Sequence, residues 1–459
     1  MIRGKTSLNA PAEGVTLNSR ERETTPFAVG AVLAAMAMVV IDSGVSNVAL
    51  PTIARSLSIS PALSVLVITS YQTALVMALL PCAAIGERFG YRRVFVQGVT
   101  LFVTASVASS LAPSLPYLVV ARFVQGLGAA AVMALGVALI RIAVSDARLV
   151  EAISWNALTV ALSAAAGPAI GALVLSFATW PWLYLVNLPI GLGVLLASRA
   201  LRSNAPGKQP LDIGSIALNC VAFGSLVTGA QNLLSLPAIA ASLFALGVLS
   251  IIAMYLREKR KVSPLMPLDL LSAPSFLVSV LASICFFTGQ TLGLIALPFY
   301  FQHGLGLTTA SAGLHMAVWP LCAAATATFA GGLINRSSSS WMCAIGASVL
   351  AFGLTSLAVG QQTSAPDLLF VLTALCGIGF VLFQVPNNRN MFLAAPQSRS
   401  GAAGAMQGTA RLSGQTAGAV ILALLFTESA PTTAPQLALG VGAGLVLMSG
   451  IISLLRTTS

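Results

Sequence analysis

The chain has 459 residues, of which 57% are hydrophobic and only 8% are charged. Ordinary soluble domains carry about 25% charged residues, so this composition excludes a soluble protein. The net charge of +11 would suit a nucleic-acid-binding protein, but the placement of the basic residues favours a membrane protein with no nucleic-acid partner.

Apolar segments of about 20 residues, the length that spans a lipid bilayer, recur along the sequence and predict about fourteen transmembrane helices. They are centred near residues 39, 74, 103, 128, 163, 190, 222, 245, 287, 322, 350, 379, 413 and 446. The loops between them are mostly short, which favours a helical bundle. Alternating segments of about ten residues, typical of a transmembrane β-barrel, do not occur. We therefore predict an all-α membrane protein.

The basic residues follow this topology. Of the 23 lysines and arginines, 20 fall in the two tails or in every second loop. This positive-inside pattern predicts a multi-pass protein of the inner (plasma) membrane with both termini in the cytoplasm, including a polar tail at 1–26. The net charge therefore reflects membrane orientation.

The first predicted helix, within 27–51, contains a single charged residue, Asp42. A carboxylate at such depth costs about 3 kcal/mol on insertion scales, so we expect it to line a cavity or find a partner. Asp42 lies eight residues before Leu50, and Arg122 lies eight residues after Ser114 in the fourth helix. Both are therefore about 12 Å below the outer boundary at 1.5 Å per residue.

At equal depth, Asp42 and Arg122 can form an ion pair. Pairing stabilises the charged carboxylate, so a substrate or a conformational change that separates the two groups would make Asp42 take up a proton. This gives proton coupling without a second acid. The alternative is a permanent ion pair that only orients the first and fourth helices.

Charges also gather in the short loop after the second predicted helix. Glu87 lies there among Arg88, Arg92 and Arg93, close to Gly90. Arginines alone would set the orientation of the helices, so the acid adds nothing to the topology and indicates a further role for this loop.

The fifth predicted helix contains Gly167, Pro168 and Gly171. Proline bends a helix, and glycine lets a neighbouring helix approach closely. Packing alone would explain these residues, and a conformational hinge or seal is the functional alternative.

Short motifs of the first half recur in the second. VALP at Val48–Pro51 corresponds to IALP at Ile295–Pro298, and GLGA at Gly126–Ala129 corresponds to GIGF at Gly377–Phe380. Parallel repeats of this kind form transporters whose substrate site lies between the halves near the midplane of the membrane.

The repeat predicts two six-helix bundles, at 27–201 and 263–459. The linker at 202–262 contains the two remaining transmembrane helices, whose only ionisable group is Asp212 at their edge. This composition favours a structural hairpin outside the transport path.

Polar residues inside the apolar helices are candidate substrate contacts. Arg411 lies ten residues into the thirteenth helix, and no acid of the second half is comparably deep. It could contact a substrate, or be satisfied by backbone carbonyls and by Gln384, Asn387 or Asn388. The remaining candidates are Asn47, Tyr71, Gln72, Asn156 and Gln290.

These motifs together resemble the major facilitator superfamily, and most closely its drug:proton antiporters with fourteen helices. IDSGVSNVALP at Ile41–Pro51 resembles the first-helix signature of that branch. ARFVQGLGAA at Ala121–Ala130 is similar to the fourth-helix signature, and GPAIG at Gly167–Gly171 to the fifth-helix motif associated with antiporters. AAIGERFGYRR at Ala83–Arg93 resembles the superfamily's loop between helices 2 and 3, with Glu87 in place of the usual aspartate. The resemblance implies a gate latch in which Glu87 meets a helix N-terminus or a neighbouring arginine.

We therefore expect a major-facilitator fold and a transporter, not an enzyme, with no cofactor and no bound metal. The expected function is proton-coupled efflux of small amphipathic, neutral or monocationic toxic compounds by a monomer that alternates its access between the two sides. The alternatives are an exporter of a specific metabolite, anionic ones included, and a membrane sensor on a transporter scaffold. The sequence contains no P-loop, which argues against an ATP-driven pump.

Overall fold

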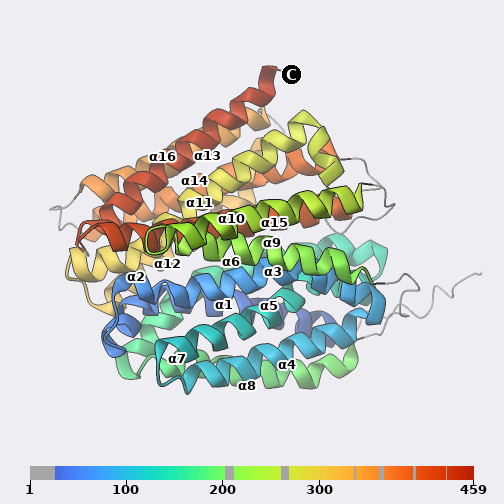
Figure 1. Cartoon of the computed structure of the whole chain (residues 1–459), viewed down its shortest axis with the longest axis horizontal. Helices are drawn as coiled ribbons and strands as arrows, with labels where there is room; N and C mark the ends of the chain where they lie inside the picture. Colours follow the sequence, from blue (N-terminus) through green and yellow to red (C-terminus); the bar gives the residue numbers. More distant parts are fainter. Residues whose placement is uncertain are drawn as a thin grey trace, which may run out of the picture.

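The computed structural model describes residues 26–201, 211–259, 268–334, 338–360, 366–395, 400–430 and 432–458. These residues form helices and turns, with no β-strand among them. Fourteen of the helical stretches are long and apolar enough to cross a membrane, which confirms the predicted number. They lie roughly side by side along one direction, as Figure 1 shows.

The N-terminal bundle contains the first six membrane-crossing stretches. They are α1 (Pro26–Ser56), α2 (Pro61–Ser64) with α3 (Leu66–Phe89), α4 (Tyr91–Ser110), α5 (Leu115–Ala143), α6 (Asp146–Phe177), and α7 (Pro181–Leu185) with α8 (Asn187–Ala197) and η1 (Ser198–Ala200). Helix α1 packs against α5, α6 and α8, and α5 packs against α3 and α4.

The C-terminal bundle contains the last six. After η2 (Leu268–Ser272) come α11 (Pro274–Phe299) with η3 (Tyr300–Gly304), α12 (Thr309–Ile334), α13 (Ser339–Val359), α14 (Pro366–Ala394), α15 (Ser400–Glu428), and α16 (Ala434–Leu454) with η5 (Leu455–Thr458). Helix α11 packs against α14, α15 and α16, and α14 packs against α12 and α13.

The sequence repeat has a counterpart in the packing. Gly126 and Gly128 bring α5 into contact with the backbones of α3 and α4. Gly377 and Gly379 do the same for α14 against α12 and α13. A side chain at any of these glycines would overlap a neighbouring backbone, so the two halves use equivalent residues to set equivalent helix contacts.

Helices α9 (Ile213–Gln231) and α10 (Pro237–Glu258) form the inserted hairpin, and α9 packs against both α3 and α15. Nδ2 of Asn219 donates a hydrogen bond to the carbonyl oxygen of Met77 in α3, at 2.8 Å. Pro81, four residues later, has no N–H to bond that carbonyl within the helix. The proline therefore leaves an acceptor on α3 that α9 uses.

Among the residues whose burial the structure describes, the two bundles share a hydrophobic core at one end. We call the end where α1 begins and α16 finishes the terminus end, and the opposite end the far end; the C-terminus marks the terminus end in Figure 1. At the far end, one buried cluster combines residues of α1, α3 and α7 with residues of α11, α12 and α14. At the terminus end the described residues of the two bundles form separate clusters, and Leu412 of α15 is the one described residue of the C-terminal bundle in the cluster of the N-terminal bundle.

A hydrogen bond also crosses between the bundles at the far end. Nε2 of Gln302, just after α11, donates to the carbonyl oxygen of Val48 in α1, at 3.5 Å. Together with the shared core, this contact shows that the structure is closed between the bundles at the far end.

Candidate functional site

A buried ion pair lies inside the N-terminal bundle. Helix α1 carries Asp42 and α5 carries Arg122, and Nη1 of Arg122 lies 2.6 Å from Oδ2 of Asp42. The two residues are only 2% and 1% exposed. The structure therefore brings together the two groups that were predicted to lie at equal depth.

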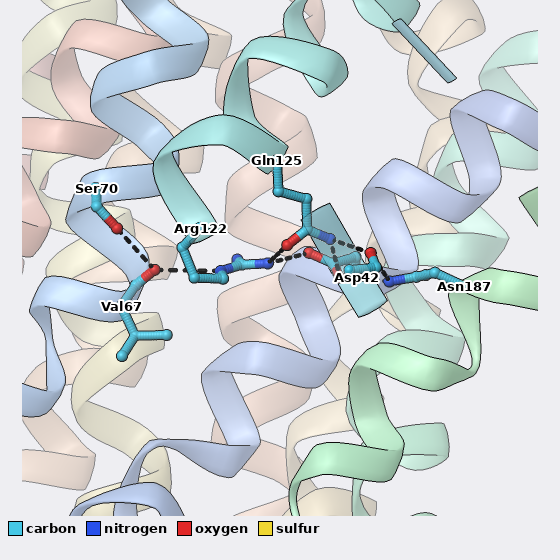
Figure 2. Close-up of polar contacts among 7 residues, drawn as sticks. Asp42, Val67, Ser70, Arg122, Gln125 and Asn187 are labelled. Carbon is cyan, nitrogen blue, oxygen red and sulfur yellow. Dashed lines mark hydrogen bonds and ion pairs between the residues drawn. The ribbon is translucent and has the colours of Figure 1, made fainter. Parts of the chain in front are cut away.

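Two amides complete the surroundings of the carboxylate (Figure 2). Gln125 and Asn187 both donate to Oδ1 of Asp42, at 2.9 and 2.7 Å. Both amides also donate to the hydroxyl oxygen of Ser106, at 2.7 and 3.1 Å. Nη1 of Arg122 donates in addition to Oε1 of Gln125, at 2.7 Å. Helices α1, α4, α5 and α8 therefore meet at one carboxylate.

Gln125, Asn187 and Ser106 were not among the predicted site residues. Gln125 lies three residues after Arg122 and hence on the same face of α5. Asn187 is an amide in an otherwise apolar segment of the sixth span. These two features of the sequence could have identified Gln125 and Asn187 as site residues.

The guanidinium of Arg122 lies against two aromatic rings. Its Cζ is 4.4 Å from the ring centroid of Tyr71 and 5.3 Å from that of Tyr184, distances that suit cation–π attraction. Its Nε also donates to the carbonyl oxygen of Val67, at 3.3 Å. Protein groups thus take the place of water around the ion pair, so Asp42 does not line an open cavity in this arrangement. Tyr71, a predicted substrate contact, supplies its ring to Arg122.

Helix α6 approaches α1 closely just beyond Asp42. A Cβ atom at Gly44 would lie 3.0 Å from the Cα of Gly167, and one at Gly171 would lie 3.2 Å from the Cα of Val45. Neither position leaves room for a larger side chain. The glycines predicted to act as a hinge or seal therefore hold α6 against the turn of α1 that follows Asp42.

The same segment of α6 also contacts the other bundle. A Cβ atom at Gly313 of α12 would lie 3.0 Å from the carbonyl oxygen of Pro168. Pro168 is buried at this contact. The motif in α6 thus lies between α1 of its own bundle and α12 of the other.

The charged loop lies at the terminus end, away from this contact. Gly90, with φ of 99°, joins α3 to α4 in a conformation that residues with a Cβ rarely adopt. Nε of Arg92 donates to the carbonyl oxygen of Ser198, at 3.2 Å. Glu87 and Arg93 are exposed, and Glu87 forms no ion pair within the described part of the chain. The latch role of this loop stays a prediction.

The other candidate substrate contacts do not gather around Asp42. Asn47 and Gln290 are buried, and Oε1 of Gln290 accepts a hydrogen bond from Thr291 at 3.2 Å. Gln72 and Asn156 are partly buried, and each has a buried amide oxygen without a hydrogen-bond partner among the described residues. A substrate role for these four residues stays a prediction.

Arg411 on α15 does not find the partners proposed for it from the sequence. Asn387 donates to Ser283 at 2.7 Å and accepts from Arg456 at 3.1 Å. Asn388 accepts from Gln407 at 3.2 Å. Nε of Arg411 is buried and has no hydrogen-bond partner among the residues that the structure describes.

Known proteins resemble this chain over nearly its whole length. It is 38% identical over 454 residues to a protein of Escherichia coli (strain K12) described as "Uncharacterized transporter YebQ", covering 97% of this chain and 98% of the relative. It is 30% identical over 403 residues to "Multidrug resistance protein Stp" of Mycobacterium tuberculosis (strain CDC 1551 / Oshkosh), covering 84% of this chain and 73% of the relative. These relatives are transport and resistance proteins, not enzymes.

A solved structure shows the same fold. A POT family transporter in complex with a thioalcohol-conjugated peptide superposes with a TM-score of 0.72, at 16% identity, covering 94% of this chain and 96% of the other. A family model for the Major Facilitator Superfamily matches residues 32–419. With that match and fourteen membrane-crossing helices in two bundles, the chain belongs to the major facilitator superfamily.

Proposed function

We propose that this transporter exports small amphipathic compounds across the inner membrane in exchange for protons, by alternating access. The observation that carries the proposal is Asp42, a carboxylate deep in the first membrane helix that is held by one cation and two amides. The similarity to a multidrug resistance protein supports export. The positive-inside pattern supports a cytoplasmic terminus end.

The chemistry of the proposal is proton uptake on separation of the ion pair. Arg122 forms an ion pair with Asp42, and Gln125 and Asn187 each donate a hydrogen bond to its carboxylate. A movement of α1 away from α5 would leave the carboxyl group in apolar surroundings without its cation, and such a group takes up a proton. Re-forming the pair with Arg122 would expel that proton.

The packing of α1 links this proton step to the opening of the far end. Gly44, which contacts Gly167 of α6, lies only two residues beyond Asp42. Opening the far end requires α1 or α6 to leave its contacts with the other bundle, so the segment that carries Asp42 moves as well. A proton would then enter from the outside when the far end opens and leave to the cytoplasm when it closes.

The proposal also concerns the charge of the exported compound. A neutral or monocationic compound was expected because Asp42 is the one deep acid. Since Arg122, Gln125 and Asn187 occupy that carboxylate, a cation would have to displace Arg122 to reach it. Export of an acidic metabolite is a second candidate, and the free Nε of Arg411 favours it.

The test is proton movement by the purified protein in liposomes that contain a pH-sensitive dye. Ethidium serves as a monocationic test compound, and the wild type is compared with Asp42→Asn. We expect compound-dependent proton movement in the wild type and its loss in the variant. Asp367→Asn, which changes an exposed acid at the start of α14, is the matched control and should behave as the wild type. Equal proton signals from the wild type and Asp42→Asn would remove Asp42 from the mechanism.

A further inference from the structure

Arg411 is an interior cation whose charge no described acid balances. The ion pairs among the described residues are Asp42–Arg122 and Asp212–Arg257. Arg411 keeps part of its surface exposed, although its Nε is enclosed and without a hydrogen-bond partner in the same part of the chain. A permanently charged group in a membrane helix is costly unless it faces a partner or a water-filled space.

The neighbours of Arg411 place it at the junction of the two bundles. Leu412 belongs to the terminus-end core of the N-terminal bundle, and Ala410 belongs to that of the C-terminal bundle. One turn earlier on α15, Gly408 faces α3, and one turn later, Gly414 packs against α11. With 3.6 residues per turn, Arg411 points between these two contacts, toward the region where the cores separate. We call this region the α3–α15 seam.

Helix α3 gives the depth of Arg411 relative to the ion pair. Arg122 bonds the carbonyl oxygen of Val67 on α3, and Gly408 faces Leu79 on the same helix. Counting at 1.5 Å per residue places Arg411 about 13 Å closer to the terminus end than Arg122. A compound that enters from the terminus end would therefore meet Arg411 before it reached the ion pair.

Two of the amides predicted as partners of Arg411 bond to other groups. Gln407, one turn before Arg411, donates to Asn388 at 3.2 Å. Asn387 bonds Ser283 and Arg456. The protein thus supplies neither an acid nor these amides to the guanidinium, which remains available to an external anion.

We propose that Arg411 binds the acidic group of amphipathic anions, so that compounds with a carboxylate or a sulfonate are among the substrates of this transporter. This inference rests on the proposed export function. A guanidinium presents two parallel N–H groups that match the two oxygens of a carboxylate. The anionic headgroup of a phospholipid offers the same chemistry, and the experiment separates the two sources.

The experiment measures binding to the full-length protein in phosphatidylcholine nanodiscs, without a pH gradient. The probes are naphthalene-2-carboxylate and its uncharged analogue naphthalene-2-carboxamide, which share shape and apolar area. We expect the wild type to prefer the carboxylate. Arg411→Gln should lose affinity for the carboxylate by about tenfold or more, the worth of a charge-assisted hydrogen bond, and keep its affinity for the amide.

Further variants separate the role of the two parallel N–H groups of the guanidinium from the role of its charge. Arg411→Lys retains the charge but not the paired N–H groups, so its affinity for the carboxylate should be intermediate. Arg199→Gln removes the same charge from an exposed position after α8 and should bind as the wild type does. If Arg411→Gln fails to fold, Arg411→Met provides the same comparison with an apolar side chain of similar length.

Three results would overturn the proposal. The first is equal wild-type affinity for the two probes, and the second is unchanged carboxylate binding in Arg411→Gln. The third is loss of carboxylate binding when phosphatidylglycerol is added to the nanodiscs, which would assign Arg411 to a lipid headgroup. Because no proton gradient is involved, these results are independent of the proton-movement test on Asp42.

Discussion

The two bundles share their helix packing but differ in how they treat a buried charge. Equivalent glycines set equivalent contacts in both halves. In the N-terminal bundle, Arg122 has an acid, an amide, a carbonyl oxygen and two aromatic rings around it. In the C-terminal bundle, Arg411 has no acid partner among the described residues. The repeat thus fixes the scaffold, while each half carries its own polar chemistry.

The largest effect on this comparison should come from Asp42→Asn. It leaves Arg122 buried without its counter-charge, and breaking a buried ion pair in this way costs about 3–5 kcal/mol. We expect a much lower unfolding temperature in detergent together with loss of proton movement. The double variant Asp42→Asn/Arg122→Gln, which removes both charges, should recover part of the stability. A single variant as stable as the wild type would show that the pair does not hold the bundle together.

Arginine-to-glutamine substitutions provide the next test, because the two sites should respond in opposite directions. Arg122→Gln leaves Asp42 uncompensated and should lower the free energy of unfolding by about 3 kcal/mol. Arg411→Gln removes an unbalanced charge and should leave the free energy of unfolding unchanged or raise it. Thermal unfolding of both variants in the same detergent checks this, and a loss of equal size at both sites would contradict the comparison.

A smaller effect is expected at the contact between α1 and α6. Gly167→Val inserts a branched side chain where Gly44 already lies at backbone distance, and overpacking of this kind costs about 1–3 kcal/mol. Transport should fall because α6 is pushed away from the segment of α1 that follows Asp42. Gly193→Val on α8 is the matched control, since a Cβ there meets no neighbouring group within 4 Å. Equal transport rates in the two variants would show that the close contact between α1 and α6 is not needed for transport.

The smallest effect should come from the hairpin. Asn219→Leu leaves the carbonyl of Met77 with only the weak thiol donor of Cys220, at 3.7 Å, and interhelical hydrogen bonds in membranes are worth about 0.6–1.7 kcal/mol. Asn232→Leu, which removes a bond at the end of α9 to its own helix (Thr228, 2.8 Å), is the comparison. Unfolding temperatures should drop more for Asn219→Leu, and the reverse order would show that the bond to α3 contributes little.

The sequence predicts some parts of this site because depth along a helix can be counted. Counting placed Asp42 and Arg122 at one level, and the structure shows them in contact. Rotation about the helix axis cannot be counted in the same way. Gln125 and Asn187 were therefore overlooked as donors, and the amides proposed for Arg411 bond elsewhere.

Glu87 was expected to meet a helix end or an arginine. In this structure it is exposed and forms no ion pair within the described part of the chain, so its latch role stays a prediction. The attachment of α9 to α3 was also not visible from the sequence. Pro81 and Asn219 are 138 residues apart, and their relation appears only once the two helices are paired.

The position of α9 has a consequence for the lipids around the protein. Helix α9 is fastened to α3 by Asn219 and also packs against α15. It therefore covers the outside of the α3–α15 seam, where Arg411 lies. Acyl chains would be kept away from the charge of Arg411 at this junction. The hairpin of α9 and α10 would shield this junction from lipid and, because it is bonded to α3, would move with the N-terminal bundle.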